Sequence, residues 1–313
     1  MTNALSPPVA AANGGGSFGR AELALYVATV ALWSSGWIGI KLQVGVVPVW
    51  QSAFYRFAIA TAVMFAWVVL SRRRIAFPWS LHLRFAALGA LMFSTNFALF
   101  YYAAQFVTSG LLAVVFSLVT VFNPINAALF LRERMSPKAL LGALIGITGI
   151  AMIYWPEVAR PETGAAAVLG LAAAVGGTLT FSLGNIVAFG VHRQGIPVIS
   201  TNAWGMAYGT VVLGLLVAAL GEPLQFEPTA VYAGVLAILG TVSTVLPMAT
   251  YLTLMRRIGP GRAGYATVMF PIGALAISWL FEGYEWTGIA IAGLALALAG
   301  NLFVLGKPRP KEG

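Results

Sequence analysis

Long apolar runs, separated by short polar connections, occupy most of the chain. Each run has about twenty residues, which is the length that an α-helix needs to cross the hydrocarbon core of a bilayer. The runs are continuously apolar rather than alternating, so they predict helices and not the strands of a barrel. They lie at roughly 22–42, 48–70, 83–104, 107–130, 138–155, 165–191, 197–220, 228–255, 260–281 and 285–306. The pattern predicts an all-α integral membrane protein with ten transmembrane helices.

Two copies of one unit become visible when the sequence is aligned with itself at an offset of 151 residues. Ala103–Leu131 then matches Leu254–Glu282 without a gap. Basic residues follow the first copy, whereas Glu282 and Glu285 follow the second, and this reversal predicts that the copies face opposite ways across the membrane. Matching pairs are Gly110 and Gly261, Leu129 and Leu280, Phe130 and Phe281, Ser136 and Thr287, Gly142 and Gly293, and Gly149 and Gly300.

Basic residues gather in alternate connections, and the other connections hold Arg160 and most of the glutamates. Because Lys and Arg resist translocation, the basic connections and both termini are predicted to be cytoplasmic. An odd number of spans in each copy then inverts the second copy. The basic set is Arg20, Arg72, Arg73, Arg74, Arg84, Arg132, Arg134, Lys138, Arg193, Arg256, Arg257, Arg262, Lys307, Arg309 and Lys311.

These boundaries predict four parts. Residues 1–20 are expected to form a disordered cytoplasmic tail, because the start of the chain is rich in Pro, Ala, Gly and Ser and lacks the features of a secretory signal. Residues 21–156 are expected to form the first five-helix repeat and residues 157–306 the second, inverted repeat. Residues 307–313 are expected to form a basic cytoplasmic tail.

Composition narrows the chemistry. Hydrophobic residues make up 59% of the chain and charged residues 9%, and the mean hydropathy is +0.87, which no soluble core could hide from water. The net charge of +9 is scattered between apolar runs, so nucleic acid is not an expected partner. With no cysteine and two histidines, disulfides, iron–sulfur clusters, thiolate catalysis and a catalytic metal are not expected, and no cofactor is predicted.

An inverted repeat favours a transporter, because rocking one half against the other exposes a site between them to each side in turn. A scaffold or a lipid flippase is the alternative. The sequence lacks the phosphate-binding loop of an ATP-driven pump, and an intramembrane enzyme would need a nucleophile and base that are not apparent, so no enzyme is predicted. No carboxylate is predicted at mid-depth, which favours a facilitator over a proton-coupled antiporter.

The first run, Ala31–Lys41, with its tryptophans, small residues and closing lysine, resembles the opening helix of the drug/metabolite transporter superfamily, EamA type. Pro48, Arg56 and Phe57, and the ends of the fourth and ninth runs with their following glycines, add to the resemblance. It implies a ten-helix carrier of the bacterial inner membrane that exports amino acids, aromatic or neutral ones foremost, or similar metabolites. Thr120 departs from the usual proline, which Pro271 supplies in the second copy. Oligomeric state stays open, and a monomer is compatible with the sequence.

Polar and aromatic residues inside the runs are the candidates for a substrate site, because polar groups in hydrocarbon cost free energy. Trp33, Trp37 and Lys41 recur every fourth residue on one helical stripe, although Lys41 could instead extend to the interface. The others could equally join helices through hydrogen bonds and packing. The predicted substrate-binding residues are Trp33, Trp37, Lys41, Asn96, Phe100, Tyr101, Ser182, Asn185, Tyr251, Tyr265 and Met269.

Overall fold

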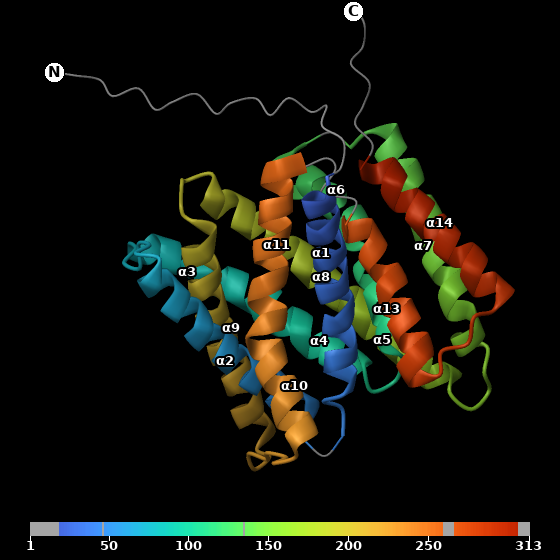
Figure 1. Ribbon diagram of the computed structural model, residues 1–313, viewed down its shortest axis with the longest axis horizontal. Helices are drawn as coiled ribbons and strands as arrows, with labels where there is room; N and C mark the ends of the chain where they lie inside the picture. Colours follow the sequence, from blue (N-terminus) through green and yellow to red (C-terminus); the bar gives the residue numbers. More distant parts are fainter. Residues whose placement is uncertain (1–18, 46, 134, 259–265, 306–313) are drawn as a thin grey trace, which may run out of the picture.

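The structure is a computed structural model that describes residues 19–45, 47–133, 135–258 and 266–305, and these residues form a bundle of helices without strands (Figure 1). We call α1 to α7 the first half and α8 to α14 the second half. The elements are α1 (Arg20–Lys41), α2 (Val49–Leu70), α3 (Trp79–Leu88), η1 (Gly89–Thr95), α4 (Asn96–Ala103), α5 (Ser109–Phe116), α6 (Val119–Leu131), α7 (Pro137–Val158), α8 (Gly164–His192), α9 (Val198–Leu220), α10 (Ala230–Gly240), α11 (Val242–Ile258), α13 (Ala266–Glu282) and α14 (Gly288–Leu305).

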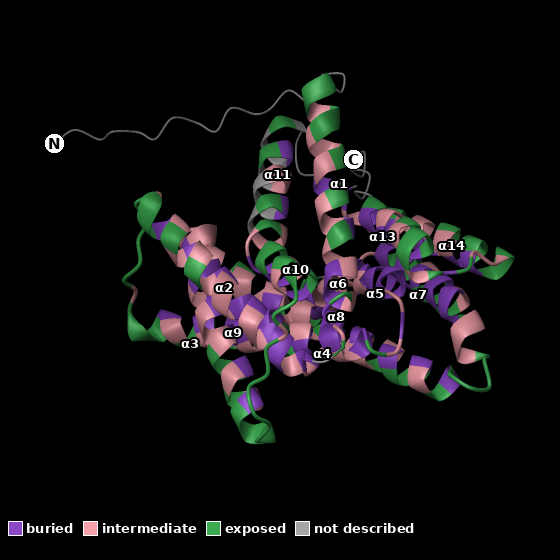
Figure 2. Cartoon of the chain, turned by 60° about the horizontal axis from the view of Figure 1, so that its bottom comes forward, coloured by how far each residue is buried: buried purple, intermediate pink, exposed green. Residues whose placement is uncertain are grey.

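Seven helical stretches of the described residues are long and apolar enough to cross a membrane. Three shorter apolar helices lie at Ala230–Thr244, Ala266–Glu282 and Gly288–Val304. Large apolar side chains are exposed, among them Leu70 and Phe281, as a lipid-facing surface requires. Figure 2 shows exposed residues along the outer helices and at the ends of the helices. The all-helical membrane class is therefore confirmed. That all ten stretches cross the bilayer, and the side on which each terminus lies, stay predictions.

Three of the apolar stretches are interrupted. The third contains the π-helical segment η1, and the fourth breaks between α5 and α6. The eighth breaks at Thr241, where φ is −110° and ψ is −74°, and Pro247 follows within α11. A proline cannot donate its backbone hydrogen bond and its ring crowds the preceding turn, so an interruption near Pro247 agrees with the sequence. Such interruptions often occur at functional sites.

Residues 151 positions apart adopt the same local structure where α6 passes into α7 and where α13 passes into α14. Arg132 and Gly283 both have a left-handed backbone, with φ of 57° and 70°. The next residue donates its N–H to a carbonyl six positions back, at 3.3 Å in each case. Ser136 and Thr287 then cap α7 and α14 through their side-chain oxygens, each accepting an N–H at 3.2 Å.

The equivalent helices α7 and α14 pack side by side along a line of glycines (Figure 1). A Cβ atom on Gly142 would lie 2.7 Å from the carbonyl oxygen of Gly300, and one on Gly149 would lie 2.5 Å from that of Gly293. Because Gly142 is equivalent to Gly293 and Gly149 to Gly300 at the offset of 151, each of these two contacts is the equivalent of the other. This is the arrangement that a two-fold axis between the two helices would produce, and it lets the backbones touch as small residues do in membrane bundles.

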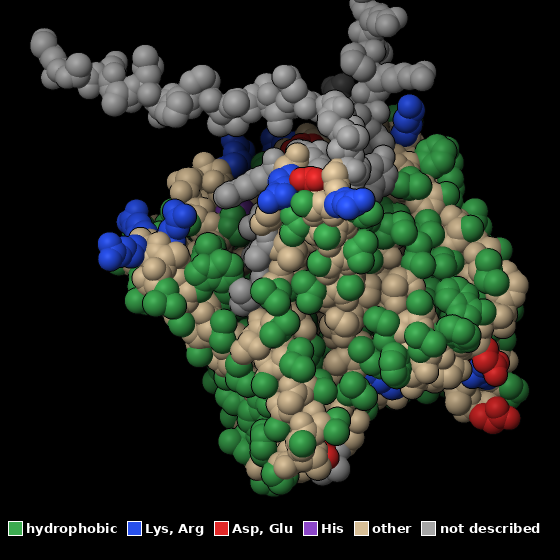
Figure 3. Space-filling view, viewed as in Figure 1, with side chains coloured by type: hydrophobic (Ala, Val, Ile, Leu, Met, Phe, Trp, Pro, Cys, Tyr) green, Lys and Arg blue, Asp and Glu red, His purple; other side chains and the backbone are tan. Residues whose placement is uncertain are grey.

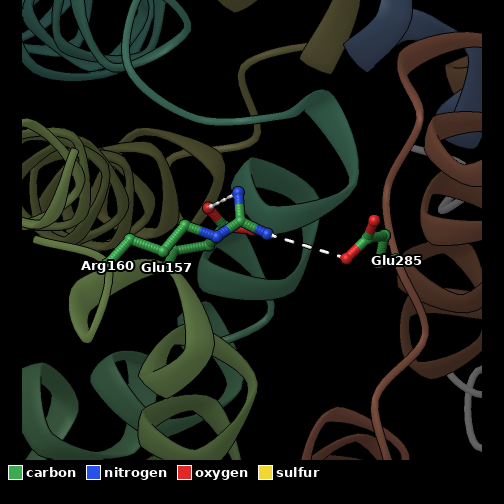
Figure 4. Close-up of polar contacts among 3 residues, drawn as sticks. All are labelled: Glu157, Arg160 and Glu285. Carbon is green, nitrogen blue, oxygen red and sulfur yellow. Dashed lines mark ion pairs between the residues drawn. The ribbon is translucent and has the colours of Figure 1, made fainter. Parts of the chain in front are cut away.

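The two ends of the bundle carry opposite charge. Lys and Arg side chains gather along the upper edge of Figure 3, where α1 begins and where α2, α6 and α8 end. Most glutamates of the described residues lie at the lower end, at the ends of α7 and α13 and in the connections that follow α7, α9 and α13, whereas Glu22 and Glu133 lie at the upper end. We call these the basic end and the acidic end. At the acidic end Arg160 lies 3.2 Å from Glu157 and 3.9 Å from Glu285 (Figure 4). These ion pairs are partly exposed, so they contribute little to stability.

Candidate functional site

Aromatic side chains from both halves meet in the middle of the bundle. Trp33 lies with its ring centroid 5.1 Å from that of Tyr251 and 6.2 Å from that of Phe270. Trp37, one turn later on α1, lies 4.9 Å from Phe100. These are tilted and edge-to-face pairs, the geometry that aromatic rings prefer. The central aromatic cluster consists of Trp33, Trp37, Phe100, Phe116, Phe181, Tyr251 and Phe270.

Phe116, the last residue of α5, links the two parts of the cluster. Its ring centroid lies 5.4 Å from that of Trp37, 4.9 Å from that of Phe181 and 6.1 Å from that of Phe270. Trp33 and Trp37 are only half-buried, whereas Phe270 is buried. The two tryptophans therefore keep part of their surface accessible.

A polar network joins α6 to α8. The Asn126 amide donates to the Ser182 hydroxyl at 2.9 Å, and that hydroxyl donates to Oδ1 of Asn123 at 2.8 Å. Asn185, one turn after Ser182, donates to the same Oδ1 at 3.2 Å. Asn126 and Ser182 are buried, while Asn123 and Asn185 are half-buried. The two half-buried amides keep hydrogen-bonding capacity beyond the network, since each amide has two donors and an acceptor with two lone pairs.

Other predicted residues have different surroundings. Asn96 donates to the carbonyl oxygen of Gly177 at 2.7 Å and so joins α4 to α8. Tyr101 is buried away from the cluster, and its hydroxyl donates to Gln43 at 2.5 Å. Met269 is 40% exposed, unlike its buried neighbour Phe270, so it does not pack into the cluster. Tyr265 lies outside the described residues.

Lys41 forms hydrogen bonds with backbone carbonyls at the acidic end. Its Nζ donates to the carbonyl oxygens of Ala104 and Val107 at 2.6 and 3.3 Å. Nearby, both carboxylate oxygens of Glu282 accept the backbone N–H of Ser109, at 3.1 and 3.0 Å, and the Ser109 hydroxyl donates to Glu282 as well. Glu282 thereby places a negative charge at the N-terminus of α5, where the helix dipole favours it.

Further hydrogen bonds hold the halves together at the acidic end. Gln51 donates to the carbonyl oxygen of Pro223 and accepts the N–H of Gln225, at 3.0 and 2.7 Å. The hydroxyls of Ser52 and Tyr232 lie 2.8 Å apart, which ties α2 to α10. The acidic end is therefore closed by polar contacts between α2 and the region from α9 to α10.

At the basic end, one helix contact of the first half is not repeated in the second half. α2 packs against α4, but α9 and α11, which the offset of 151 relates to α2 and α4, have no comparable contact among the described residues. Figures 1 and 2 show α11 standing apart from α9 at this end. The contact between α2 and α4 thus has no equivalent between α9 and α11, whereas the start of α9 is joined to the connection after α2 by Ser200 and Trp204, which donate to the carbonyl oxygens of Arg74 and Ile75 at 2.8 and 2.9 Å.

A cavity of about 220 Å³ lies away from the cluster, between α2, α9 and the η1–α4 stretch. Its lining is mostly apolar, with Trp50, Leu99 and Leu216 among the contributing side chains, and Thr95 from the π-helical segment is exposed beside it. Helices of both halves line this cavity, but none of the residues of the central aromatic cluster does.

Sequence reasoning identified Trp33, Trp37, Phe100, Ser182 and Tyr251 as site candidates, and the structure brings all of them into the cluster or the polar network. Asn185 also joins the network. The missed members are Asn123, Asn126, Phe116, Phe181 and Phe270. The two asparagines on either side of Pro124 carried a usable signal, because amides are as costly within an apolar run as those that were chosen. The phenylalanines carried none, since they occur throughout the chain.

Comparisons with known proteins agree with this architecture. A sequence model of the EamA-like transporter family matches residues 20–155 and again residues 167–306. Uncharacterized transporter YoaV of Bacillus subtilis is 22% identical over 279 residues, which cover 88% of this chain and 93% of YoaV. A probable terminal-alkyne amino-acid exporter of Streptantibioticus cattleyicolor is 26% identical over 280 residues, covering 89% of this chain and 91% of that protein.

One solved crystal structure has a TM-score of 0.61 at 18% identity and covers 90% of this chain and 96% of its own, which shows a shared fold. The family match spans most of the chain in two segments, and the helices are apolar on their exposed faces. The chain belongs to the EamA-like transporter family, a family of membrane proteins that move small molecules.

Proposed function

We propose that this protein exports amino acids with aromatic or other neutral side chains, or similar small amphipathic metabolites, along a path between its two halves. The single observation that supports this most is the central aromatic cluster, which is built from α1, α4 and α5 of the first half and α8, α11 and α13 of the second. A site built from both halves changes shape when one half moves against the other.

The chemistry of the junction suits an amphipathic solute. The half-buried rings of Trp33 and Trp37 offer a surface for an aromatic or apolar side chain. The amides of Asn123 and Asn185 offer donors and acceptors for a polar group. The relative named as a probable amino-acid exporter supports the same class of substrate.

The charge distribution supports an orientation. By the positive-inside rule the basic end faces the cytoplasm of a bacterium, with the protein in the inner membrane and its two repeats inverted. The equivalent local structures at Arg132 and Gly283 and the glycine contacts between α7 and α14 support the inverted repeat. The separation of α9 from α11, whose equivalents α2 and α4 are in contact, then supports a carrier open toward the cytoplasm.

Facilitated movement down the substrate gradient is the proposed form of transport. Over the described residues the glutamates lie at helix ends and in connections, as Glu282 does at the end of α13. A proton-coupled carrier would need a carboxylate or histidine deeper in the path. A proton-coupled antiporter would instead accumulate substrate under a pH gradient alone.

Counterflow in proteoliposomes tests the proposal. Vesicles preloaded with phenylalanine are expected to take up labelled phenylalanine transiently, with no requirement for a pH gradient or membrane potential. Replacing Asn123 with alanine removes the acceptor shared by Ser182 and Asn185, and the rate is expected to fall about tenfold, as loss of a buried hydrogen-bond partner predicts. Thr148→Ala is the matched control, because Thr148 is exposed on α7 and bonds only within its own helix.

Absence of counterflow for a panel of amino acids, nucleosides and sugars by well-folded protein would refute the transport proposal. Accumulation driven by protons alone would refute facilitation while leaving the substrate class intact. Equal rates for the Asn123 and Thr148 variants would remove the polar network from the site.

A further inference from the structure

Arg56 is a buried cation, and no carboxylate of the described residues balances its charge. It lies in the third turn of α2, counted from the acidic end, and is only 6% exposed. No carboxylate among the described residues forms an ion pair with it. Its Nε and Nη1 have no hydrogen-bond partner in the described part of the chain. A buried charge of this kind is strongly unfavourable unless something pairs with it.

The side chains around Arg56 reduce the free-energy cost of burying its charge but do not cancel it. The guanidinium carbon lies 4.7 Å from the ring centroid of Phe97 and 5.8 Å from that of Phe57, which is a cation–π arrangement. The Tyr101 hydroxyl lies close enough to interact with the guanidinium, and it donates its own proton to Oε1 of Gln43. The Nε2 group of Gln43 is buried and has no hydrogen-bond partner among the described residues either. The polar groups gathered around Tyr101 therefore have a surplus of donors.

Lys41 provides a contrast within the same structure. It is the last residue of α1, at the acidic end, and two backbone carbonyls accept hydrogen bonds from its ammonium group. Arg56 has no such acceptors at Nε and Nη1. The missing component at Arg56 is thus an acceptor, and a negatively charged one would also balance the charge. Arginine pairs especially well with planar carboxylates.

Arg56 also lies at a junction that must separate if the acidic end opens. Ser52, one turn before it on the same face of α2, bonds to Tyr232 of α10. The carbonyl oxygen of Arg56 lies 3.2 Å from where a Cβ atom on Gly240 would be, so α10 covers this part of α2. Movement of α10 away from α2 would expose the guanidinium to a solute in the path between the halves.

We propose that Arg56, assisted by the Gln43 amide, binds the carboxylate of the transported molecule. The inference rests on the proposed function and deepens it, because it requires substrates to carry a carboxylate and assigns that group to the wall formed by α2, α4 and α10. The aromatic cluster would then hold the side chain of the same substrate at a different stage of its passage.

Binding to purified protein tests the anion site without transport. Phenylacetate and phenylacetamide have nearly the same shape, but only the first is an anion. At fixed ionic strength and chloride, phenylacetate is expected to raise the melting temperature of the wild-type protein, and phenylacetamide is not. The affinity for phenylacetate is expected to weaken roughly thirtyfold or more in Arg56→Gln, since a buried charged partner is removed. Arg84→Gln removes an exposed arginine of α3 and serves as the charge-matched control.

Arg56→Lys keeps the charge but loses the planar donors, so intermediate affinity is expected, and it covers the case in which Arg56→Gln fails to fold. Equal stabilisation of wild-type protein by phenylacetate and phenylacetamide would overturn the inference, as would unchanged phenylacetate affinity in both Arg56 variants.

A transport assay distinguishes a failure of the anion site at Arg56 from a failure of the proposed export function. Wild-type vesicles are expected to exchange phenylalanine and N-acetylphenylalanine, which keep the carboxylate, and to exclude phenylalaninamide, which lacks it. Equal exchange of phenylalanine and its amide would refute the role of Arg56 while leaving amino-acid export intact. Phenylacetate binding that depends on Arg56 in protein that exchanges no amino acid would keep the anion site and refute the proposed export.

Discussion

Replacing Gly149 with alanine tests the close packing of α7 against α14. The added Cβ would lie 2.4 Å from the backbone nitrogen of Ala297 and 2.5 Å from the carbonyl oxygen of Gly293. Ordinary contacts of carbon with such atoms are about 3.5 Å or longer, so the helices must separate by about 1 Å. Neither obstructing atom belongs to a flexible side chain, so rotation of a side chain cannot relieve the clash. The strain therefore spreads along the whole interface.

Overpacking of this kind costs about 1–3 kcal/mol. For a chain of this size each kcal/mol lowers the melting temperature by about 2–4 °C, so a fall of roughly 2–12 °C is expected. The measurement is thermal unfolding of purified protein in one detergent at one heating rate, because unfolding of such proteins is commonly irreversible.

Gly146→Ala supplies the control on the same helix. A Cβ on Gly146 would meet its nearest neighbour, a methyl group of Val121, at 3.9 Å, so it fits without movement. Both substitutions change helix propensity equally, and their difference isolates the packing. Gly293→Ala should resemble Gly149→Ala, because a Cβ on Gly293 would lie 2.6 Å from the carbonyl oxygen of Gly149. Equal melting temperatures for the Gly146 and Gly149 variants would refute the reasoning.

Two further predictions concern the acidic end. Glu282→Ala should lower the free energy of unfolding by about 1–2 kcal/mol, because the N–H and hydroxyl of Ser109 lose their acceptor. Glu285→Ala is the control, because it removes an exposed carboxylate and should change the free energy of unfolding by less than about 0.5 kcal/mol. Burial, with the charge of Glu157 second, raises the pKa of Tyr284 to about 12. In the unfolded chain the tyrosine loses its proton near pH 10. The folded protein is therefore expected to keep its full stability below pH 10 and to lose stability as the pH rises from 10 to about 12. Tyr284→Phe should reduce this loss when unfolding is measured as a function of pH. Equal effects of Glu282→Ala and Glu285→Ala on unfolding would contradict the first prediction. An identical pH profile of stability for the wild type and Tyr284→Phe would contradict the second.

Part of the site could be predicted because helical periodicity is a local property. Trp33 and Trp37 are four residues apart, so they share a face of α1 wherever that helix lies, and both join the cluster. The same periodicity placed Lys41 on that stripe, yet its long side chain turns to the carbonyls of Ala104 and Val107. Which acceptor a flexible cation reaches depends on a connection that is remote in sequence.

Buried polar residues divide in the same way. The cost of an amide in hydrocarbon marked Asn96 and Asn185 as special, but cost alone does not say which partner relieves it. Asn96 bonds to a backbone carbonyl of α8 and joins helices, while Asn185 shares Asn123 with Ser182 at the junction of the halves. The distinction requires knowing which helices are neighbours.

The order of apolar runs, the offset of 151 residues and the uneven distribution of charge are written in the sequence, because hydrophobicity and charge act on each segment separately. They determined the helical membrane class and the likeness to a family of carriers. Only the tertiary structure decided that α7 touches α14 through glycines, that α9 stands apart from α11, and that Arg56 is buried without a counterion among the described residues. Contacts between distant helices arise from the shape and packing of whole surfaces, and no local pattern specifies them.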